Sequence, residues 1–261
     1  TPGSIAWPSD DRQKDMNAFV QGVLRKSFSP LYTLRISAKG SYDDIYYSSS
    51  WGDSRYGQTE LQLNSSHDFQ IKDWWKLSFA ADARWDALMS TEYEASRLTA
   101  LSALASSIST ERFMGTFALE YEGAFDRGAL SRNALSPSAD LRFTAFEGFD
   151  IVAFGRRAYR IPTFNELYYV GYGNPQLAPE DAWLTDLGID FNRGVNATWT
   201  LKLKVDAFCN LLKNKIVSAP TEEDPNIWAP YNIGKVRSVG MDLLAGTSYE
   251  NGDWNASAEV R

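Results

Sequence analysis

Residues 157–168 read RAYRIPTFNELY, and they are followed by GNPQL at 173–177 and APE at 178–180. Pro162, Pro175 and Pro179 fix the backbone φ angle and remove hydrogen-bond donors, and Asn174 before Pro175 favours a turn. Gly173 permits a tight reversal of the chain. The sequence therefore predicts a rigid loop here.

Apolar and polar residues alternate outside this loop. In the segment 75–87 the odd positions from Trp75 to Trp85 are apolar, whereas the even positions include Lys76 and Arg84. A strand between lipid and a polar lumen needs this pattern, and charges on the second face exclude a dry core there. We expect about twelve strands, most clearly at 75–87, 113–126 and 199–210, then at 31–40, 58–66, 139–146, 183–192, 236–249 and 254–261, and most weakly at 17–26, 92–107 and 150–160.

Turn signals separate these strands in two alternating kinds. Short breaks lie near 27–30, 67–72, 107–110, 147–150, 192–196 and 250–253. Mostly longer polar connections lie between them, at 42–56, 127–138, 161–181 and 218–230, with a brief one near 88–92. Short turns at one end and long loops at the other are typical of outer-membrane barrels. The fold class predicted is all-β, an antiparallel transmembrane β-barrel.

Several other classes of protein fit less well. No apolar run reaches the length of a transmembrane helix. The net charge of −7 and the scattered basic residues argue against a nucleic-acid partner. A spacing near 40 residues also suggests a soluble propeller, but the single histidine, His67, cannot supply its repeated Gly-His signature. Cys209 is the only cysteine, so no internal disulfide can form.

The loop at 157–180 resembles the loop that identifies the barrel of TonB-dependent outer-membrane receptors. The resemblance extends over residues 133–261, through TDLG at 185–188 and YNIGKVRSVGMD at 231–242. The positions that carry the loop motif are Arg160, Pro162, Asn165, Glu166, Leu167, Tyr168, Asn174, Pro175, Pro179 and Glu180.

Membership of that family implies a barrel of 22 strands with a plugged lumen. Because residues 1–261 provide about twelve strands, we expect the whole chain to be an interior part of one such barrel. The plug domain and the closing strands are expected to be absent from it. An open sheet edge in lipid is costly, so this piece alone is not expected to span a membrane stably.

The resemblance implies a receptor that takes up a scarce, bulky solute of the vitamin B12 or ferric siderophore type. Its location would be the bacterial outer membrane, in contact with lipid, and its energy would come from TonB and inner-membrane proteins through the missing plug. A surface lipoprotein is a further expected partner. Two alternatives remain open: a passive porin or structural barrel, and a soluble β-rich binding protein. Catalysis is not expected, because the chain lacks the histidines for nucleophilic or zinc chemistry.

Loop aromatic residues could grip such a solute, or could instead pack within the loops. This set comprises Tyr46, Tyr47, Trp51, Tyr168, Tyr169, Tyr172, Trp228 and Tyr231. Asp43, Asp44 and Asp53 share one predicted connection and offer the oxygen ligands that Ca²⁺ prefers, although their spacing matches no defined calcium loop. A solvated acidic loop is the alternative, and no other cofactor is expected.

Overall fold

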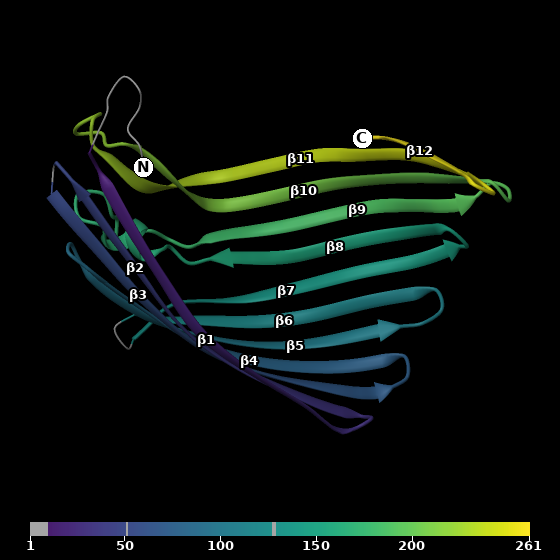
Figure 1. The fold of residues 1–261 in the computed structure, drawn as a ribbon, viewed down its shortest axis with the longest axis horizontal. Helices are drawn as coiled ribbons and strands as arrows, with labels where there is room; N and C mark the ends of the chain where they lie inside the picture. Colours follow the sequence, from purple (N-terminus) through teal and green to yellow (C-terminus); the bar gives the residue numbers. More distant parts are fainter. Residues whose placement is uncertain (1–9, 51, 127–128) are drawn as a thin grey trace.

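The structure, a computed structural model, describes residues 10–50, 52–126 and 129–261. Within them, one antiparallel sheet contains twelve strands in sequence order, which confirms the predicted count and fold class (Figure 1). The strands are β1 Arg12–Ser29, β2 Tyr32–Ser49, β3 Gly52–Lys72, β4 Trp75–Ser90, β5 Glu94–Ser109, β6 Phe113–Asp126, β7 Ala129–Phe146, β8 Phe149–Arg160, β9 Glu180–Gly194, β10 Trp199–Pro220, β11 Trp228–Asn251 and β12 Trp254–Val260.

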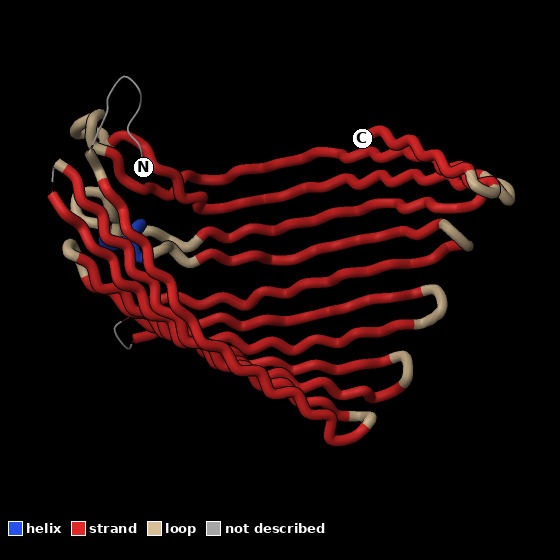
Figure 2. Tube along the Cα trace, viewed as in Figure 1, coloured by secondary structure: helices blue, strands red, loops and turns tan. Residues whose placement is uncertain are grey.

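The sheet curves along its width, and its two ends differ (Figure 2). Tight turns close the hairpins at one end, such as the two-residue turns at 73–74 and 147–148. The other end carries the connections at 91–93, 161–179 and 221–227, and a single helix, α1 (Phe164–Tyr168), lies in the longest of them. We call this second end the loop-bearing end.

Three of the long connections predicted from the sequence are wrong in extent. At 42–56, β2 continues to Ser49 and β3 begins at Gly52, and at 127–138, β7 begins at Ala129. At 218–230, only residues 221–227 lie outside strands. The hairpins continue past the region in which one face must be apolar, so their outer parts lose the hydrophobic alternation but keep the backbone ladder.

The strands present two faces of different chemistry. Residues of β1, β3, β4 and β8 surround one polar cavity, which only a concave surface permits; we call this the concave face. The opposite, convex face is apolar and carries side chains such as Leu61, Trp85 and Leu98. Few side chains are fully buried, and the largest of these are Leu167, Pro162 and Pro230 at the loop-bearing end. The sheet is therefore a wall, and its packed core lies under the long loop.

Aromatic rings gather at the end with the tight turns. Ring centroids lie 5.0 Å apart in the pair Tyr32–Phe69 and 4.9 Å apart in the pair Trp199–Tyr249. Amphipathic rings suit the level of lipid headgroups, where a barrel wall has its aromatic girdle. Among the described residues, no helix is long and apolar enough to cross a membrane.

Candidate functional site

The loop 161–179 begins with a short capped helix. Thr163 is the N-cap of α1: its hydroxyl accepts from the backbone N–H of Glu166 (3.3 Å), and its own N–H donates to the Glu166 carboxylate (2.7 Å). This reciprocal capping box satisfies donors that a five-residue helix cannot satisfy itself. Behind the helix the chain turns back so closely at Gly173 that a Cβ there would lie 2.7 Å from the backbone nitrogens of Tyr168 and Tyr169.

Arg160 joins the start, the helix and the end of the loop. Its Nε donates to Glu180 (2.8 Å), while its two terminal nitrogens donate to the carboxylate of Glu166 (3.0 and 3.2 Å). The other oxygen of Glu180 accepts from the backbone N–H of Ile216 in β10 (2.8 Å). Three of the residues assigned to the family motif thus form one ion network that ties the loop to the wall.

Arg97 anchors the loop from the other side. This β5 side chain is 8% exposed; it donates to Asp126 (2.8 Å) and to the backbone oxygen of Pro162 (2.9 Å). Its guanidinium also lies 5.1 Å from the ring centroid of Phe164. Arg132 completes the arrangement with bonds to Asp126 (3.0 Å) and to the oxygen of Leu177 (3.3 Å). Sequence reasoning missed Arg97, because it lies in one of the weakest predicted strands.

Asn232 in β11 fixes the last part of the loop. Its amide nitrogen donates to the oxygens of Ala178 (2.9 Å) and Asn214 (2.8 Å), and its oxygen accepts from the N–H of Ala178 (2.7 Å). Asn174 donates to the oxygen of Pro230 (3.1 Å), a residue that is itself fully buried. Asn232 belongs to the family-like stretch 231–242, from which no role was predicted for it, and in this structure it holds the loop.

Three of the predicted ligand-contacting tyrosines lie within the same loop. The hydroxyl of Tyr169 accepts from Tyr56 (3.5 Å), and its ring centroid lies 6.5 Å from that of Tyr93. Tyr168 is 6.4 Å from the Tyr93 ring, and the hydroxyls of Tyr172 and Ser218 are hydrogen-bonded. Tyr169 and Tyr172 therefore contact strands of the wall, whereas Tyr168 lies beside the connection 91–93; Tyr169 also lines the polar cavity.

The structure does not bring the remaining predicted aromatics into one group. Tyr47 lines the cavity and donates to Asp11 (2.8 Å). Tyr46, the next residue of the strand, points to the opposite face. Trp228 and Tyr231, 53% and 36% exposed, lie at the start of β11, and Trp51 is outside the described residues. Direct contact with a solute stays a prediction for this set.

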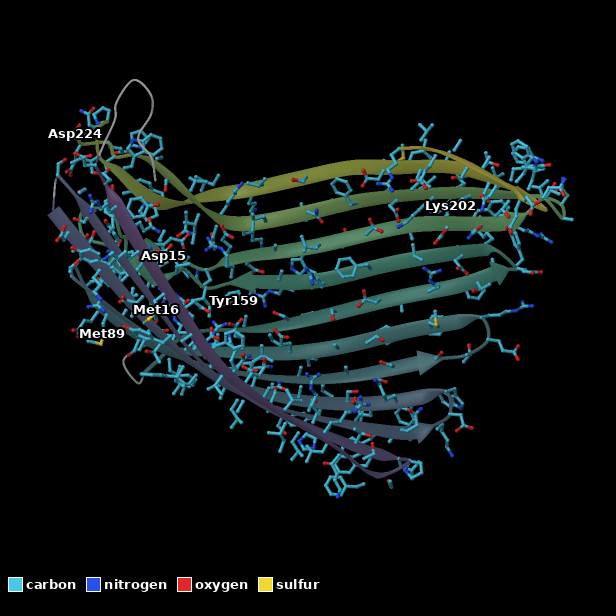
Figure 3. The ribbon with its side chains drawn as sticks, viewed as in Figure 1. Asp15, Met16, Met89, Tyr159, Lys202 and Asp224 are labelled. Carbon is cyan, nitrogen blue, oxygen red and sulfur yellow. The ribbon has the colours of Figure 1, made fainter. Side chains whose placement is uncertain are left out.

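A cavity of about 930 Å³ lies on the concave face beneath the loop. Polar side chains from β4, β5 and β6 line it, including Arg84, Arg97 and Glu122, and the alternation at 75–87 predicted that Arg84 lies on the polar face. Thr99 is 6% exposed and its hydroxyl has no hydrogen-bond partner among the described residues. Aromatic residues complete the lining, one of them Tyr159, labelled in Figure 3. The cavity can therefore offer both aromatic and charged contacts.

The carboxylates considered for calcium have separate partners. Asp43 accepts from Asn17, while Asp44 accepts from Arg55 (2.7 and 3.1 Å) and Asp53 from Tyr46 (2.7 Å). Asp43 and Asp44 are neighbours in β2, so their side chains point to opposite faces. Among the described residues, no group of three or more His, Cys, Asp or Glu side chains could hold a metal ion. Calcium binding by these residues stays a prediction.

Two ionisable groups in the connections have altered pKa values. Burial of Glu166 opposes its ionisation, but hydrogen bonds from Arg160 and Thr163 outweigh this and lower its pKa. Burial raises the pKa of Tyr93 to about 12, with the nearby Glu92 and Tyr169 acting in the same direction. At neutral pH Glu166 is therefore an anion within the Arg160 network, and Tyr93 remains a protonated donor, hydrogen-bonded to Asn165.

Comparison with known families identifies the class of protein. The family described as TonB dependent receptor-like, beta-barrel, matches residues 97–260, and the chain belongs to this family. Its members are outer-membrane proteins of Gram-negative bacteria, which places the chain in that membrane and argues against the soluble alternatives.

Individual relatives agree with this assignment. The vitamin B12 transporter BtuB of Vibrio vulnificus (strain YJ016) is 28% identical over 111 residues, which are 42% of this chain and 16% of that protein. The FrpB iron transporter from Neisseria meningitidis (F3-3 variant) matches the fold with a TM-score of 0.69 at 15% identity. The copper transporter OprC matches with a TM-score of 0.72 at 16% identity.

These structural matches also show how much of a receptor the chain represents. They cover 99% of this chain and 45% of FrpB, and 93% of this chain and 45% of OprC. The chain thus spans less than half the length of these two transporters. At such low identity, the likeness to FrpB and OprC shows the fold alone.

Proposed function

We propose that the receptor to which this chain belongs imports a bulky solute of the vitamin B12 or ferric siderophore type, driven through TonB and its inner-membrane partners. The observation that carries the proposal is the cavity beneath the loop 161–179, where polar side chains of the wall and aromatic rings of the loop surround about 930 Å³. A solute with a large organic surface and several polar groups suits such a lining.

Vitamin B12 is the first solute to test. The relative with the higher sequence identity, 28%, is named a vitamin B12 transporter. The solved relatives have lower identities, and their names refer to iron, copper, siderophores and a hemophore. We propose no enzymatic role: the named relatives are transporters and receptors. A surface lipoprotein partner and a loop calcium ion remain predictions that no contact in the described residues supports.

Calorimetric titration of the full-length receptor with cyanocobalamin and with several ferric siderophores tests the proposal. We expect one of them to bind with a dissociation constant below micromolar. Tyr169→Ala should weaken that binding by about tenfold or more, because it removes an aromatic wall of the cavity. Tyr121→Ala, a tyrosine that is 42% exposed in β6, is the control. Binding no tighter than micromolar for every solute would contradict the proposal.

Passive diffusion is the alternative mechanism, because a polar concave face would also suit a porin. Uptake of the bound solute by cells with and without functional TonB separates the two mechanisms. Active transport predicts that cells with functional TonB accumulate the solute against its gradient. Without TonB, uptake should stop. Uptake that continues at the same rate without TonB would favour the porin.

A further inference from the structure

Asn165 of α1 is a cavity residue with one unused hydrogen-bonding group. Its side chain is exposed and lines the cavity beneath the loop 161–179. Its amide oxygen accepts from the hydroxyl of Tyr93, a residue outside the cavity lining. Among the residues that the structure describes, its amide nitrogen has no hydrogen bond. The two N–H donors of Asn165 are therefore available at the cavity.

Tyr93 is fixed through both its backbone and its ring. The hydroxyl of Ser90 accepts from the backbone N–H of Tyr93 (3.0 Å) and donates to its backbone oxygen (2.8 Å). The ring centroid of Tyr93 lies 6.4 Å from that of Tyr168 and 6.5 Å from that of Tyr169. Because backbone and ring are both held, the hydroxyl of Tyr93 has little freedom to leave Asn165.

The direction of the hydrogen bond between Tyr93 and Asn165 decides which end of the amide faces the cavity. Burial raises the pKa of Tyr93 to about 12, and the charge of Glu92 acts in the same direction. At neutral pH the hydroxyl therefore keeps its proton and donates it to the amide oxygen. The oxygen and the nitrogen of a planar amide point in different directions, so an oxygen held by Tyr93 leaves the nitrogen for the cavity.

The charges of the cavity favour a neutral partner for these donors. Among the described residues, the cavity lining contains three cations, and each forms an ion pair with a carboxylate: Arg84 with Asp86 (2.9 Å), Arg97 with Asp126 (2.8 Å) and Arg160 with Glu180 (2.8 Å). Glu122 of the lining and Glu92, which accepts from Tyr56 (3.3 Å), have no ion pair with any described residue. These carboxylates would repel an anionic solute, whereas a neutral carbonyl oxygen would not be repelled.

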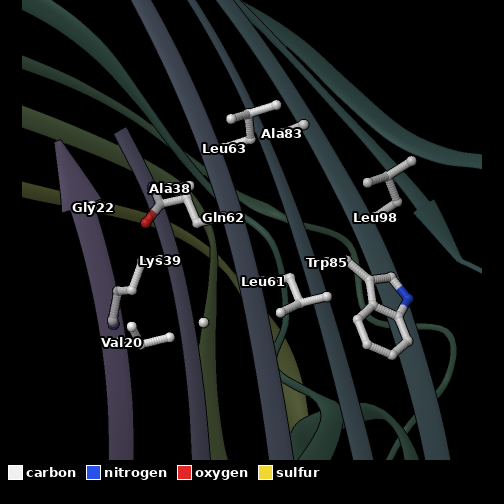
Figure 4. A pocket seen from close by; sticks show the side chains of 11 residues that line it. Val20, Gly22, Ala38, Lys39, Leu61, Gln62, Leu63, Ala83, Trp85 and Leu98 are labelled. Carbon is white, nitrogen blue, oxygen red and sulfur yellow. The ribbon is translucent and has the colours of Figure 1, made fainter. Parts of the chain in front are cut away.

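The convex face has a hollow of different chemistry. It measures about 590 Å³ and lies over β1–β5, where Ala38 and Ala83 leave space between Leu61 and Trp85 (Figure 4). Its exposed lining is almost entirely apolar, and this face meets lipid in an outer-membrane barrel. Polar recognition of a solute therefore belongs to the concave face, where Asn165 lies.

We propose that Asn165 is a binding residue of the solute site and that its amide nitrogen donates to a neutral carbonyl oxygen of the solute. Tyr93 is the positioning residue that orients this amide. The assignment rests on the proposed uptake of a bulky solute, and it adds the chemical group by which that solute is recognised. Cyanocobalamin carries such oxygens in its amide side chains, and neutral ferric hydroxamate siderophores also carry carbonyl oxygens, whereas a ferric tris-catecholate complex is an anion.

Calorimetric titration of the full-length receptor tests the proposal with three solutes: cyanocobalamin, a neutral ferric hydroxamate siderophore and a ferric tris-catecholate siderophore. We expect one of the two neutral solutes to bind more tightly than the tris-catecholate. For that solute, Asn165→Asp should weaken binding by about tenfold or more, because a carboxylate oxygen replaces the donor while Tyr93 keeps its acceptor. Asn251→Asp is the control, because Asn251 lies at the tight-turn end of β11.

A double-mutant cycle separates positioning by Tyr93 from a general effect on the fold. Tyr93→Phe keeps the ring but removes the hydroxyl, so the amide of Asn165 can rotate and binding should weaken about threefold. Asn165→Ala should weaken binding about fivefold. Adding Tyr93→Phe to it should have no further effect, because the oriented amide is already absent. Tyr32→Phe, which removes a hydroxyl hydrogen-bonded to His67 (2.9 Å) near the tight turns, should leave binding unchanged.

The outcomes distinguish this assignment from solute uptake itself. Equal affinity of the receptor and its Asn165→Asp and Asn165→Ala variants for the neutral solute would overturn the role of Asn165 and leave solute uptake standing. Tighter binding of the tris-catecholate by the unsubstituted receptor would overturn the preference for a neutral carbonyl. Additive losses for Tyr93→Phe and Asn165→Ala would show that Tyr93 does not position the amide. If none of the three solutes binds, the proposed function fails and this assignment fails with it. Circular dichroism checks that each variant is folded, and either Asn165 variant tests the site if the other does not fold.

Discussion

The loop-bearing end and the strand wall use their side chains in different ways. At the loop, particular atoms meet: Arg160 contacts two carboxylates, and Asn232 makes three hydrogen bonds to backbone groups. In the wall, the backbone ladder provides the connections, and side chains such as Leu104 and Phe117 remain 51% and 45% exposed. Chemical identity therefore decides which residues are tolerated at the loop and at its anchors, whereas polarity is the main requirement at the lipid-facing positions of the wall.

This contrast explains why the motif recognised in the sequence is short and local. At a lipid-facing position such as Leu104, one apolar side chain can replace another, so alternation persists without a fixed sequence. A residue such as Gly173 has no substitute, because a Cβ would meet the backbone. The same physical difference predicts which substitutions are costly.

The largest effect is expected for Arg97→Met. The change leaves Asp126 with a weaker set of partners and removes the bond to Pro162, and loss of a buried ion-pair partner costs about 3 to 5 kcal/mol. Limited proteolysis of the full-length receptor within residues 161–179 should become faster. The control is Arg84→Met, a cation of the concave face that is 45% exposed. If both variants resist the protease equally, the anchoring role of Arg97 is wrong.

A charge on the convex face should produce the next largest effect. Phe117→Lys places a cation against lipid and is expected to lower the free energy of unfolding by about 2 to 4 kcal/mol, depending on its depth. Leu104→Val, which keeps the face apolar, should cost about 1 kcal/mol or less. Denaturant unfolding in lipid vesicles measures both. Similar losses for the two variants would contradict the difference proposed between loop and wall.

A smaller loss is expected for Asn232→Ala. It removes two hydrogen bonds between β11 and Ala178 of the loop and a third to Asn214 of β10, for a cost of about 2 kcal/mol. Asn210→Ala in β10 is a matched control, because that side chain has no hydrogen bond among the described residues. Proteolysis of residues 161–179 should accelerate only in the first variant, and an equal response of both would show that Asn232 does not hold the loop.

The smallest effect is expected for acidification, which should loosen the loop. In the folded protein, the pKa of Glu166 is lower than its ordinary value of 4.5. The Glu166 anion therefore stabilises the loop fully above pH 4.5. This contribution is lost as the pH falls through the lowered pKa. Protease resistance of residues 161–179 should therefore decline below pH 4.5. Glu166→Gln should be less resistant at pH 7 and should lose this component of the pH dependence; an unchanged profile would contradict the assignment.

Much of the fold could be predicted because the physical requirement repeats along the chain. The alternation at 75–87 and 113–126 follows from a wall with one apolar and one polar face, and the structure places β4 and β6 there. The extent of the outer hairpins could not be predicted in this way. Near 42–56 both faces are polar, so strand and loop have similar composition and only backbone pairing distinguishes them.

The candidate site was predictable only in part, because some of its residues lie far from the motif in the sequence. Arg160, Glu166 and Glu180 carry the family motif, and the structure joins them in one network. Arg97 and Thr99 come from a weakly patterned strand, Arg97 being 65 residues before its partner Pro162, and nothing local in the sequence distinguishes them. Their importance arises because the loop folds back across the concave face and contacts strands distant in sequence.

The alternating wall, the number of strands, the ends at which short and long connections lie, and the family could all be predicted from the sequence. Those features depend on local periodicity and on a contiguous motif, which a chain displays before it folds. Which arginine anchors the loop, which tyrosines reach the cavity and where small residues leave a hollow on the convex face followed only from the folded chain. Each of these depends on strand register and curvature, which bring distant residues together and which no local pattern specifies.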